Sequence, residues 1–167
     1  LITMATLTVW KYNSADGAKN ALAKLAELQK QRLIQIEDAA IVFWPQGRKK
    51  PKTTQAVDLV GSGAFGGAFW GLLFGLIFFV PVLGMAVGAL AGALSGYFTD
   101  YGIDDEFIKD VRNQVTEGTS ALFLLTSSVT LDKVEEAFKD EEKGELIKSN
   151  LTNEQEAKLR EDFGADE

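Results

Sequence analysis

The residue types that most often perform catalysis are missing from this sequence, which contains neither His nor Cys. Their absence removes thiol and imidazole nucleophiles, the commonest general base and the commonest zinc ligands. Four carboxylates crowd together at Asp104, Asp105, Glu106 and Asp110 and raise the question of a metal site. Acidic residues at the positive end of a helix dipole explain the cluster more simply. We expect no enzyme activity, no metal and no cofactor.

A glycine motif at residues 61–66, GSGAFG, matches the G-x-G-x-x-G pattern of dinucleotide-binding turns. Such turns need an acidic residue ~20 positions further on to bind the ribose, and this sequence has none there. We therefore assign these glycines to helix packing and identify no small-molecule substrate. The net charge of −7 also excludes nucleic acid as the main partner, because phosphate binding needs a basic face.

The central part of the chain is apolar and carries no charged residue between Asp58 and Asp100. Residues 60–80 have the ~20-residue length of a bilayer-spanning helix, and residues 82–98 lie near the lower limit of that length. Pro81 marks the break between these two arms. The pattern predicts a helical hairpin over residues 59–99 that is transmembrane or re-entrant. Its apolar tip leaves a re-entrant or enclosed hairpin open, because a full crossing normally exposes a polar turn.

Each predicted arm carries a glycine at every fourth position, which produces a flat stripe along a helix. Such stripes let helix backbones approach closely, and close packing is a main source of helix association in lipid. We predict that helix packing and oligomerisation involve Gly63, Gly67, Gly71, Gly75, Gly84, Gly88, Gly92 and Gly96. Large surfaces suited to lipid or to a partner subunit are expected from Phe65, Phe69, Phe74, Phe78 and Phe79.

A basic cluster precedes the first arm and consists of Arg48, Lys49, Lys50 and Lys52. Basic residues within ~15–20 positions of a membrane segment favour the cytoplasmic side. We therefore expect both termini in the cytoplasm. The same four residues are candidates for contact with lipid headgroups, and an ordinary solvated turn remains the alternative.

The chain on either side of the insertion has the pattern of an α+β fold. Apolar and polar residues alternate in a strand at residues 5–12, an apolar run closes a second strand at 33–44, and β-branched residues at hairpin distance predict a third at 52–58. A buried strand is expected at 120–126 and a short last strand at 146–149. Helices are predicted over residues 18–31, with a cap at Ser14, over 104–118, from Thr130 and from Thr152. This order resembles a ferredoxin-like sandwich, formed by residues 1–58 and 100–167 and split by the hairpin at 59–99.

Three segments together resemble a bacterial family of predicted membrane proteins, called domain of unknown function twelve-sixty-nine. They are KLAELQK at residues 24–30, GSGAFGGAFWGLL at 61–73 and DYGIDDEFI at 100–108. The resemblance runs over nearly the whole chain. It implies membrane association and a bacterial origin, and it brings no activity or catalytic residues with it.

Our leading hypothesis is a non-enzymatic, homo-oligomeric protein of the bacterial inner membrane, assembled through the glycine hairpins, with a cytoplasmic α/β domain and membrane lipid as partner. One alternative is a soluble, self-assembling shell or filament that buries its apolar hairpins and holds lipid. A third is a pore or transporter subunit, which the uncharged insertion disfavours because ion and proton paths usually carry ionisable groups. The sequence does not indicate the physiological role.

Overall fold

The computed structural model describes residues 6–55, 67–79, 103–126, 133, 136 and 144–149. These residues form an α+β fold with a five-stranded antiparallel sheet. The elements are β1 (Thr6–Tyr12), α1 (Gly17–Lys30), β2 (Ile36–Phe43), β3 (Lys52–Gln55), α3 (Gly67–Phe74), η1 (Gly75–Phe79), α6 (Asp105–Gln114), β4 (Ser120–Thr126) and β5 (Glu145–Ser149).

The strand order in the sheet is β3-β2-β4-β1-β5, and every neighbouring pair is antiparallel. Strand β4 lies at the centre, and all seven of its residues are buried. Its register places Phe123 opposite Val9 of β1 and opposite Ala40 of β2. The predicted hairpin between β2 and β3 is confirmed, with Phe43 paired to Lys52.

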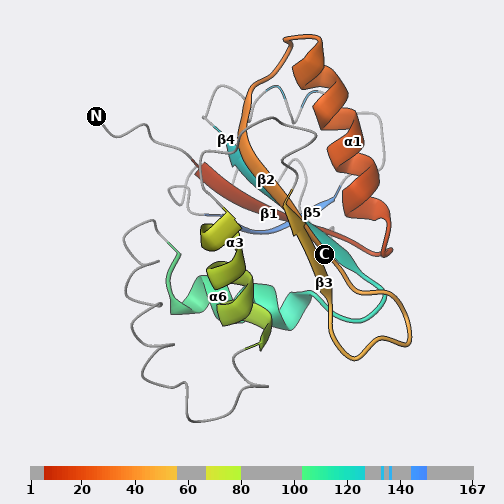
Figure 1. Ribbon diagram of the computed structural model, residues 1–167, viewed down its shortest axis with the longest axis vertical. Coiled ribbons are helices and arrows are strands. Elements are labelled where there is room, and N and C mark those ends of the chain that lie inside the picture. The colour runs from red at the N-terminus through yellow and green to blue at the C-terminus, as the bar shows by residue number, and fades with distance from the viewer. Residues whose placement is uncertain are drawn as a thin grey trace.

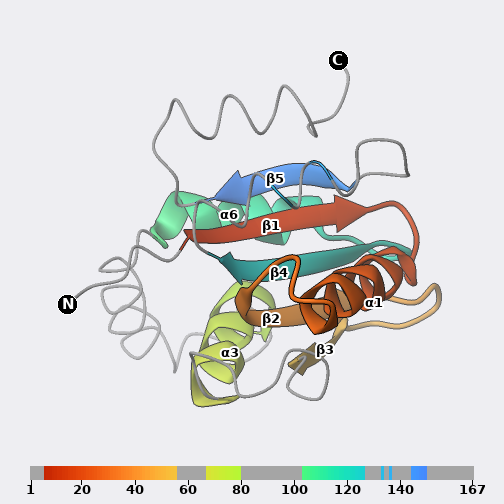
Figure 2. The same cartoon turned by 90° about the horizontal axis from the view of Figure 1, so that it is seen from above.

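Helices cover both faces of this sheet, with α1 on one side and α3 and α6 on the other (Figures 1 and 2). On the first side, Leu22 and Leu25 of α1 pack with Leu122 and Leu124 of β4. On the opposite side, η1 and α6 form a second core with the strand residues whose side chains point to that face, such as Val9 and Phe123. The sheet therefore separates two apolar cores, as the period of two along a strand requires.

The apolar stripe predicted for the helix after the insertion is confirmed, because Phe107, Ile108, Val111 and Val115 are all buried. Other details of the helix ends differ from the prediction. Helix α6 ends at Gln114 and not at Gly118, which instead lies in the following turn with a φ of +85°. A left-handed φ of this kind suits glycine, which has no Cβ.

The predicted cap of the first helix at Ser14 is wrong. The N-cap residue of α1 is Asp16, and its side chain makes no capping hydrogen bond. Ser14 contributes its backbone carbonyl, which accepts a hydrogen bond from the Ser120 hydroxyl at 2.7 Å. The Ser120 hydroxyl in turn accepts from the Ala18 backbone amide at 2.9 Å. A residue of β4 thus satisfies an amide in the first turn of α1, a function that local sequence patterns do not reveal.

The predicted ferredoxin-like arrangement of the whole chain is not established, because helices cover both faces of the sheet. None of the helices in the described part of the chain has the length and apolar character that a membrane crossing requires. Residues 67–79 of the predicted first arm form α3 and η1, whereas the second arm lies outside the described residues. The predicted helix from Thr152 also lies outside them, and of the one from Thr130 only Lys133 and Glu136 are described, both helical.

Candidate functional site

The first apolar arm packs on the face of the sheet that lies opposite α1 (Figure 1). Trp70 is 2% exposed, and Leu73 is fully buried beside it. The ring of Phe123 on β4 meets the ring of Phe74 edge-on, with 5.1 Å between the ring centroids. Trp70 meets the same Phe123 ring edge-on at 6.3 Å and stacks on Phe74 at 5.7 Å. Such aromatic pairs add to the stabilisation that burial of their area provides.

The arm's aromatic residues do not all have the surroundings that we expected. We expected large surfaces for lipid or a partner subunit, but Phe69 and Phe74 are buried within the protein's own core, and Phe78 is partly buried against it. A helix that is apolar on every side has the same sequence pattern in lipid and in a protein interior. Phe65 and the side chain of Phe79 lie outside the described residues.

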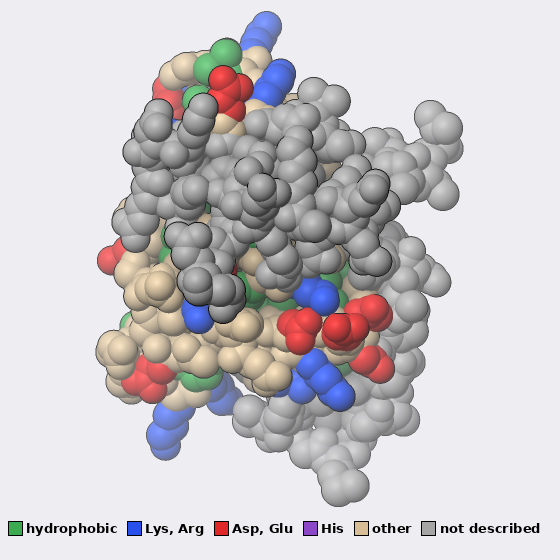
Figure 3. Space-filling view, turned by 180° about the vertical axis from the view of Figure 1, so that it is seen from behind, with side chains coloured by type: hydrophobic (Ala, Val, Ile, Leu, Met, Phe, Trp, Pro, Cys, Tyr) green, Lys and Arg blue, Asp and Glu red, His purple; other side chains and the backbone are tan. Residues whose placement is uncertain are grey.

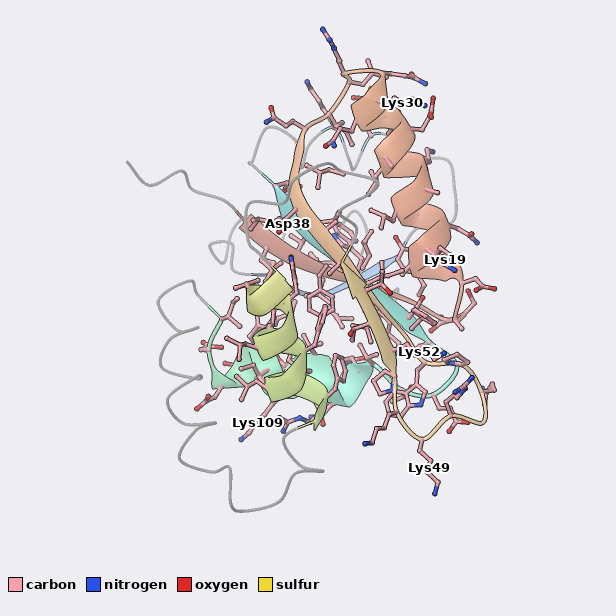
Figure 4. The ribbon with its side chains drawn as sticks, in the orientation of Figure 1. Lys19, Lys30, Asp38, Lys49, Lys52 and Lys109 are labelled. Atoms are coloured by element: carbon pink, nitrogen blue, oxygen red, sulfur yellow. The ribbon has the colours of Figure 1, made fainter. Side chains whose placement is uncertain are left out.

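A buried hydrogen bond joins this arm to the sheet through the carboxylate of Asp38 on β2. Asp38 is fully buried, and its Oδ2 accepts a hydrogen bond of 3.0 Å from the Trp70 indole Nε1. Its Oδ1 accepts a second bond of 2.8 Å from the backbone amide of Ala39. Figure 4 shows Asp38 near the upper end of α3, close to the middle of the molecule. Because a buried charge is costly unless it is hydrogen-bonded, the Trp70 bond ties the position of α3 to that of β2.

An irregularity in β2 places Asp38 on the face that α3 covers. The register with β4 shifts between Ile36, which pairs with Thr126, and Asp38, which pairs with Leu125. Ile36 belongs to the core beneath α1, whereas Asp38 bonds to Trp70 on the other side of the sheet. A bulge re-aims side chains in this way, because one extra residue reverses the alternation of faces.

Arg112 of α6 holds the other end of the arm. Its Nε donates a hydrogen bond of 2.6 Å to the carbonyl oxygen of Ile77, and its Nη2 donates one of 2.9 Å to the carbonyl oxygen of Leu76. Both carbonyls belong to η1, which is wound as a π-helix. A cation that bonds the free carbonyls at the end of a helix also complements the negative end of its dipole. Arg112 therefore holds the end of η1 against α6.

The predicted glycine stripe faces away from the sheet wherever the structure describes it. Gly71 is exposed, Gly75 is partly exposed, and a Cβ added to either would meet nothing within 4 Å. A Cβ on Gly17 would lie 2.4 Å from the Tyr12 side chain, so tight packing requires that glycine. Leu72, beside Gly71, is 43% exposed. The domain does not itself require the two arm glycines, and their outward face is open to another surface.

The remaining residues of the predicted stripe are only partly placed. Gly67 begins α3, and nothing further is described for it. The other positions lie outside the described residues: Gly63, Gly84, Gly88, Gly92 and Gly96. The motif at residues 61–66 that matches a dinucleotide-binding turn lies outside them as well.

The predicted basic residues Arg48, Lys49, Lys50 and Lys52 are all exposed, in the turn between β2 and β3 and at the start of β3. They lie apart from the Asp38–Trp70 contact, and the tip of the turn is marked by Lys49 in Figure 4. The two sets of predicted residues therefore lie apart in the structure. The described stripe glycines lie on α3 and η1, whereas the basic residues lie at the turn of the β2–β3 hairpin.

The acidic residues near α6 have structural partners. Asp104 is the N-cap of α6, and its Oδ1 accepts a hydrogen bond of 2.9 Å from the backbone amide of Phe107. Asp110 forms an ion pair of 3.1 Å with Lys148 on β5. Figure 3 shows acidic side chains gathered beside basic ones on the rear face of the molecule. The interpretation of Asp104 as a helix start is confirmed.

The contacts around α3 are suited to positioning a segment of chain, because they combine ring packing, one buried carboxylate and a helix-end cation. Sequence reasoning missed both Asp38 and Arg112. Asp38 was detectable as the carboxylate directly before an apolar strand run, and Trp70 as an indole donor within an uncharged segment. A buried indole N–H usually finds an acceptor, so these two observations belong together.

We expect Trp70→Phe to lower the free energy of unfolding by about 2 kcal/mol, because the buried Asp38 carboxylate loses a donor. The matched control is Trp44→Phe, which removes the same group from a half-exposed bond to the Arg48 carbonyl oxygen. Urea unfolding of the protein measures both losses. Equal losses in the two variants would contradict the assigned importance of the Asp38–Trp70 contact.

Arg112→Met should loosen the end of the arm, because the carbonyls of Leu76 and Ile77 lose a charged donor. We expect faster amide hydrogen exchange across η1 and a loss of about 1–2 kcal/mol in unfolding free energy. Lys109→Met, at an exposed position of the same helix, serves as the control. Unchanged exchange in η1 would rule out a capping role for Arg112.

Comparison with known proteins gives one match. Residues 64–164, more than half of the chain, match the family model described as protein of unknown function (DUF1269). No curated protein and no solved structure matches the chain significantly. The match covers α3, η1, α6, β4 and β5. The segment at residues 24–30 lies outside the match, which includes most of the segment at 61–73 and all of the one at 100–108. The chain therefore belongs to the DUF1269 family of proteins of unknown function.

Proposed function

We propose that this protein is a non-enzymatic, membrane-associated homo-oligomer of the bacterial inner membrane. Its α/β domain lies on the cytoplasmic side, and its apolar insertion enters the lipid from that side without crossing. The observation that carries the proposal is the docking of residues 67–79 on the domain's own sheet. This docking reduces the length of chain that remains for the membrane.

The remaining length favours a re-entrant segment over a crossing hairpin. The described part of the arm ends at Phe79, the last residue of η1, and the description resumes at Ile103, which is buried in the core. A hairpin needs ~20 residues for each crossing, so the chain from 80 to 102 is too short to cross twice. Two helical legs of ~11 residues each would reach ~17 Å, about half of the ~30 Å hydrocarbon layer.

The composition of that segment suits burial in lipid. It contains no charged residue before Asp100, and its first residues are the apolar run VPVLG at 80–84. A tip that stays inside the membrane needs no polar turn, which explains why this run lacks one. A pore lined by these hairpins gains no support, because a pore requires segments that reach the far side.

The open glycine face supports self-association. Gly71 and Gly75 present bare backbone on the outside of the arm, next to the exposed side chain of Leu72. Helices in lipid associate through such small-residue faces, because their backbones can approach closely. We assign this face to contact with a second copy of the chain, since the domain has no packing use for these glycines.

The fold adds one finer inference. We infer a ferredoxin-like unit from the strand order β5-β1-β4-β2, in which α1 connects β1 to β2. We infer that β3, α3, η1 and α6 are additions to that unit. On this interpretation, the additions on the α3 side connect a common soluble fold to the membrane.

Single-cysteine labelling tests the re-entrant arrangement, and the natural absence of Cys gives a clean background. We expect Lys49→Cys to react with a membrane-impermeant maleimide in inverted vesicles and not in intact spheroplasts. Leu83→Cys should react in neither until detergent is added. Labelling of Leu83→Cys from the outside would establish a full crossing, and release of the protein by alkaline carbonate would favour the soluble shell.

Gly71→Leu tests the self-association face. We expect the variant to fold with equal or higher stability, by up to ~1 kcal/mol, because glycine is a poor helix former. The detergent-solubilised particle should nevertheless become smaller in native mass measurements. The control Ala23→Leu adds the same side chain to the exposed face of α1 and should leave the mass unchanged. An unaltered mass for Gly71→Leu would remove this face from the assembly.

A further inference from the structure

The turn between β2 and β3 has a defined backbone, which a set of hydrogen bonds holds in place. The Trp44 indole Nε1 donates to the Arg48 carbonyl oxygen at 2.8 Å. The Gly118 amide donates to the Trp44 carbonyl oxygen at 2.6 Å, and the Gly47 amide donates to Glu117 Oε2 at 2.6 Å. Gly47 has a φ of +85°, which a residue with a side chain rarely adopts. The basic side chains therefore project from a prepared surface.

The charge of this turn is opposite to that of the whole protein. Arg48, Lys49, Lys50 and Lys52 place four positive charges within five residues of a chain whose net charge is −7. All four are exposed, and they form no ion pair with other described residues. Glu117 is the acidic neighbour, and its carboxylate is occupied by the Gly47 amide. We call residues 44–52 the basic turn.

The basic turn lies at the same end of the molecule as η1, the last described part of the apolar arm. In Figure 1 the loop between β2 and β3 and the last turn after α3 both point to the lower end of the long axis. Figure 4 shows Lys49 projecting from that end and Lys30 at the opposite end. Figure 3 shows basic side chains extending from the same lower end. The basic turn and η1 thus lie at the same end of the molecule.

The half-exposed indole of Trp44 strengthens this placement. Its N–H is bonded within the turn, so the ring lies at the base of the basic cluster. Indole rings are enriched at the headgroup level of membranes, because they combine an apolar ring with a polar N–H group. By contrast, Trp10 is 4% exposed and belongs to the core beneath α1.

We propose that the basic turn docks on anionic lipid headgroups and sets the tilt of the domain on the membrane. The inference rests on the proposed membrane association and adds the lipid class and the orientation. The turn touches the surface, the arm enters beside it, and the end of α1 near Lys30 points away from the lipid. Anionic lipid is favoured over an acidic protein as the partner because η1, the last described part of the apolar arm, lies at the same end of the molecule as the basic turn.

Binding to vesicles of two compositions tests the proposal. The probes are neutral phosphatidylcholine vesicles and vesicles with ~30% phosphatidylglycerol, which give the surface its negative potential. Lys49→Gln/Lys50→Gln should weaken binding to the anionic vesicles roughly 30-fold, the effect of two surface charges. Binding to neutral vesicles should not change. The control Lys30→Gln/Arg32→Gln removes the same charge at exposed positions of the opposite end and should bind as the unaltered protein does.

A second readout reports orientation. A fluorophore on Lys49→Cys should be quenched by headgroup-labelled lipid, whereas one on Lys30→Cys should not. Equal quenching at the two sites, or equal loss of anionic binding in the two charge-removal pairs, would overturn the proposal and leave membrane association intact. Failure of the unaltered protein to bind neutral vesicles would instead overturn the proposed function. Circular dichroism confirms that each variant folds.

Discussion

The buried carboxylate of Asp38 and its indole partner Trp70 form the contact on which the rest of this structure depends. A charged group with no exposed surface must be hydrogen-bonded, and the donor comes from the apolar arm. Once Trp70 is fixed, its ring and that of Phe74 pack on Phe123, and η1 reaches Arg112. One polar contact and the aromatic rings around it thus hold residues 67–79 of the arm on the sheet.

This docking changes the role of half of the insertion. From the sequence, residues 60–80 qualify as a membrane helix because length and lack of charge are the criteria. The structure places Leu73 and Ile77 at zero exposure within the core that α6 completes. Under the proposed function, a shorter part of the insertion is therefore left for lipid. The sequence of an apolar helix indicates that the helix is shielded from water, but it does not indicate whether lipid or protein shields it.

The fold was largely predictable where periodic patterns are strong. Alternation located β1, β-branched residues at hairpin distance located the β2–β3 hairpin, and the stripe from Phe107 to Val115 located α6. The docking site was not predictable by the same means. Trp70 lies 32 positions from Asp38, and Arg112 lies 35 from Ile77. Periodicity describes neighbours within one element, whereas these contacts depend on the sheet order and on a bulge that reverses one face.

The central position of β4 has a consequence for the order of biosynthesis. Phe123, which the arm covers, is translated after the arm itself, because Trp70 and Phe74 precede it in the chain. At synthesis rates of ~5–20 residues per second, the arm waits a few seconds before its binding surface emerges from the ribosome. During that interval β1 and β2 have no central strand to join them. A nascent chain with so apolar a segment exposed needs early protection from water, and under the proposed function the bilayer beside the ribosome would supply it before the sheet does.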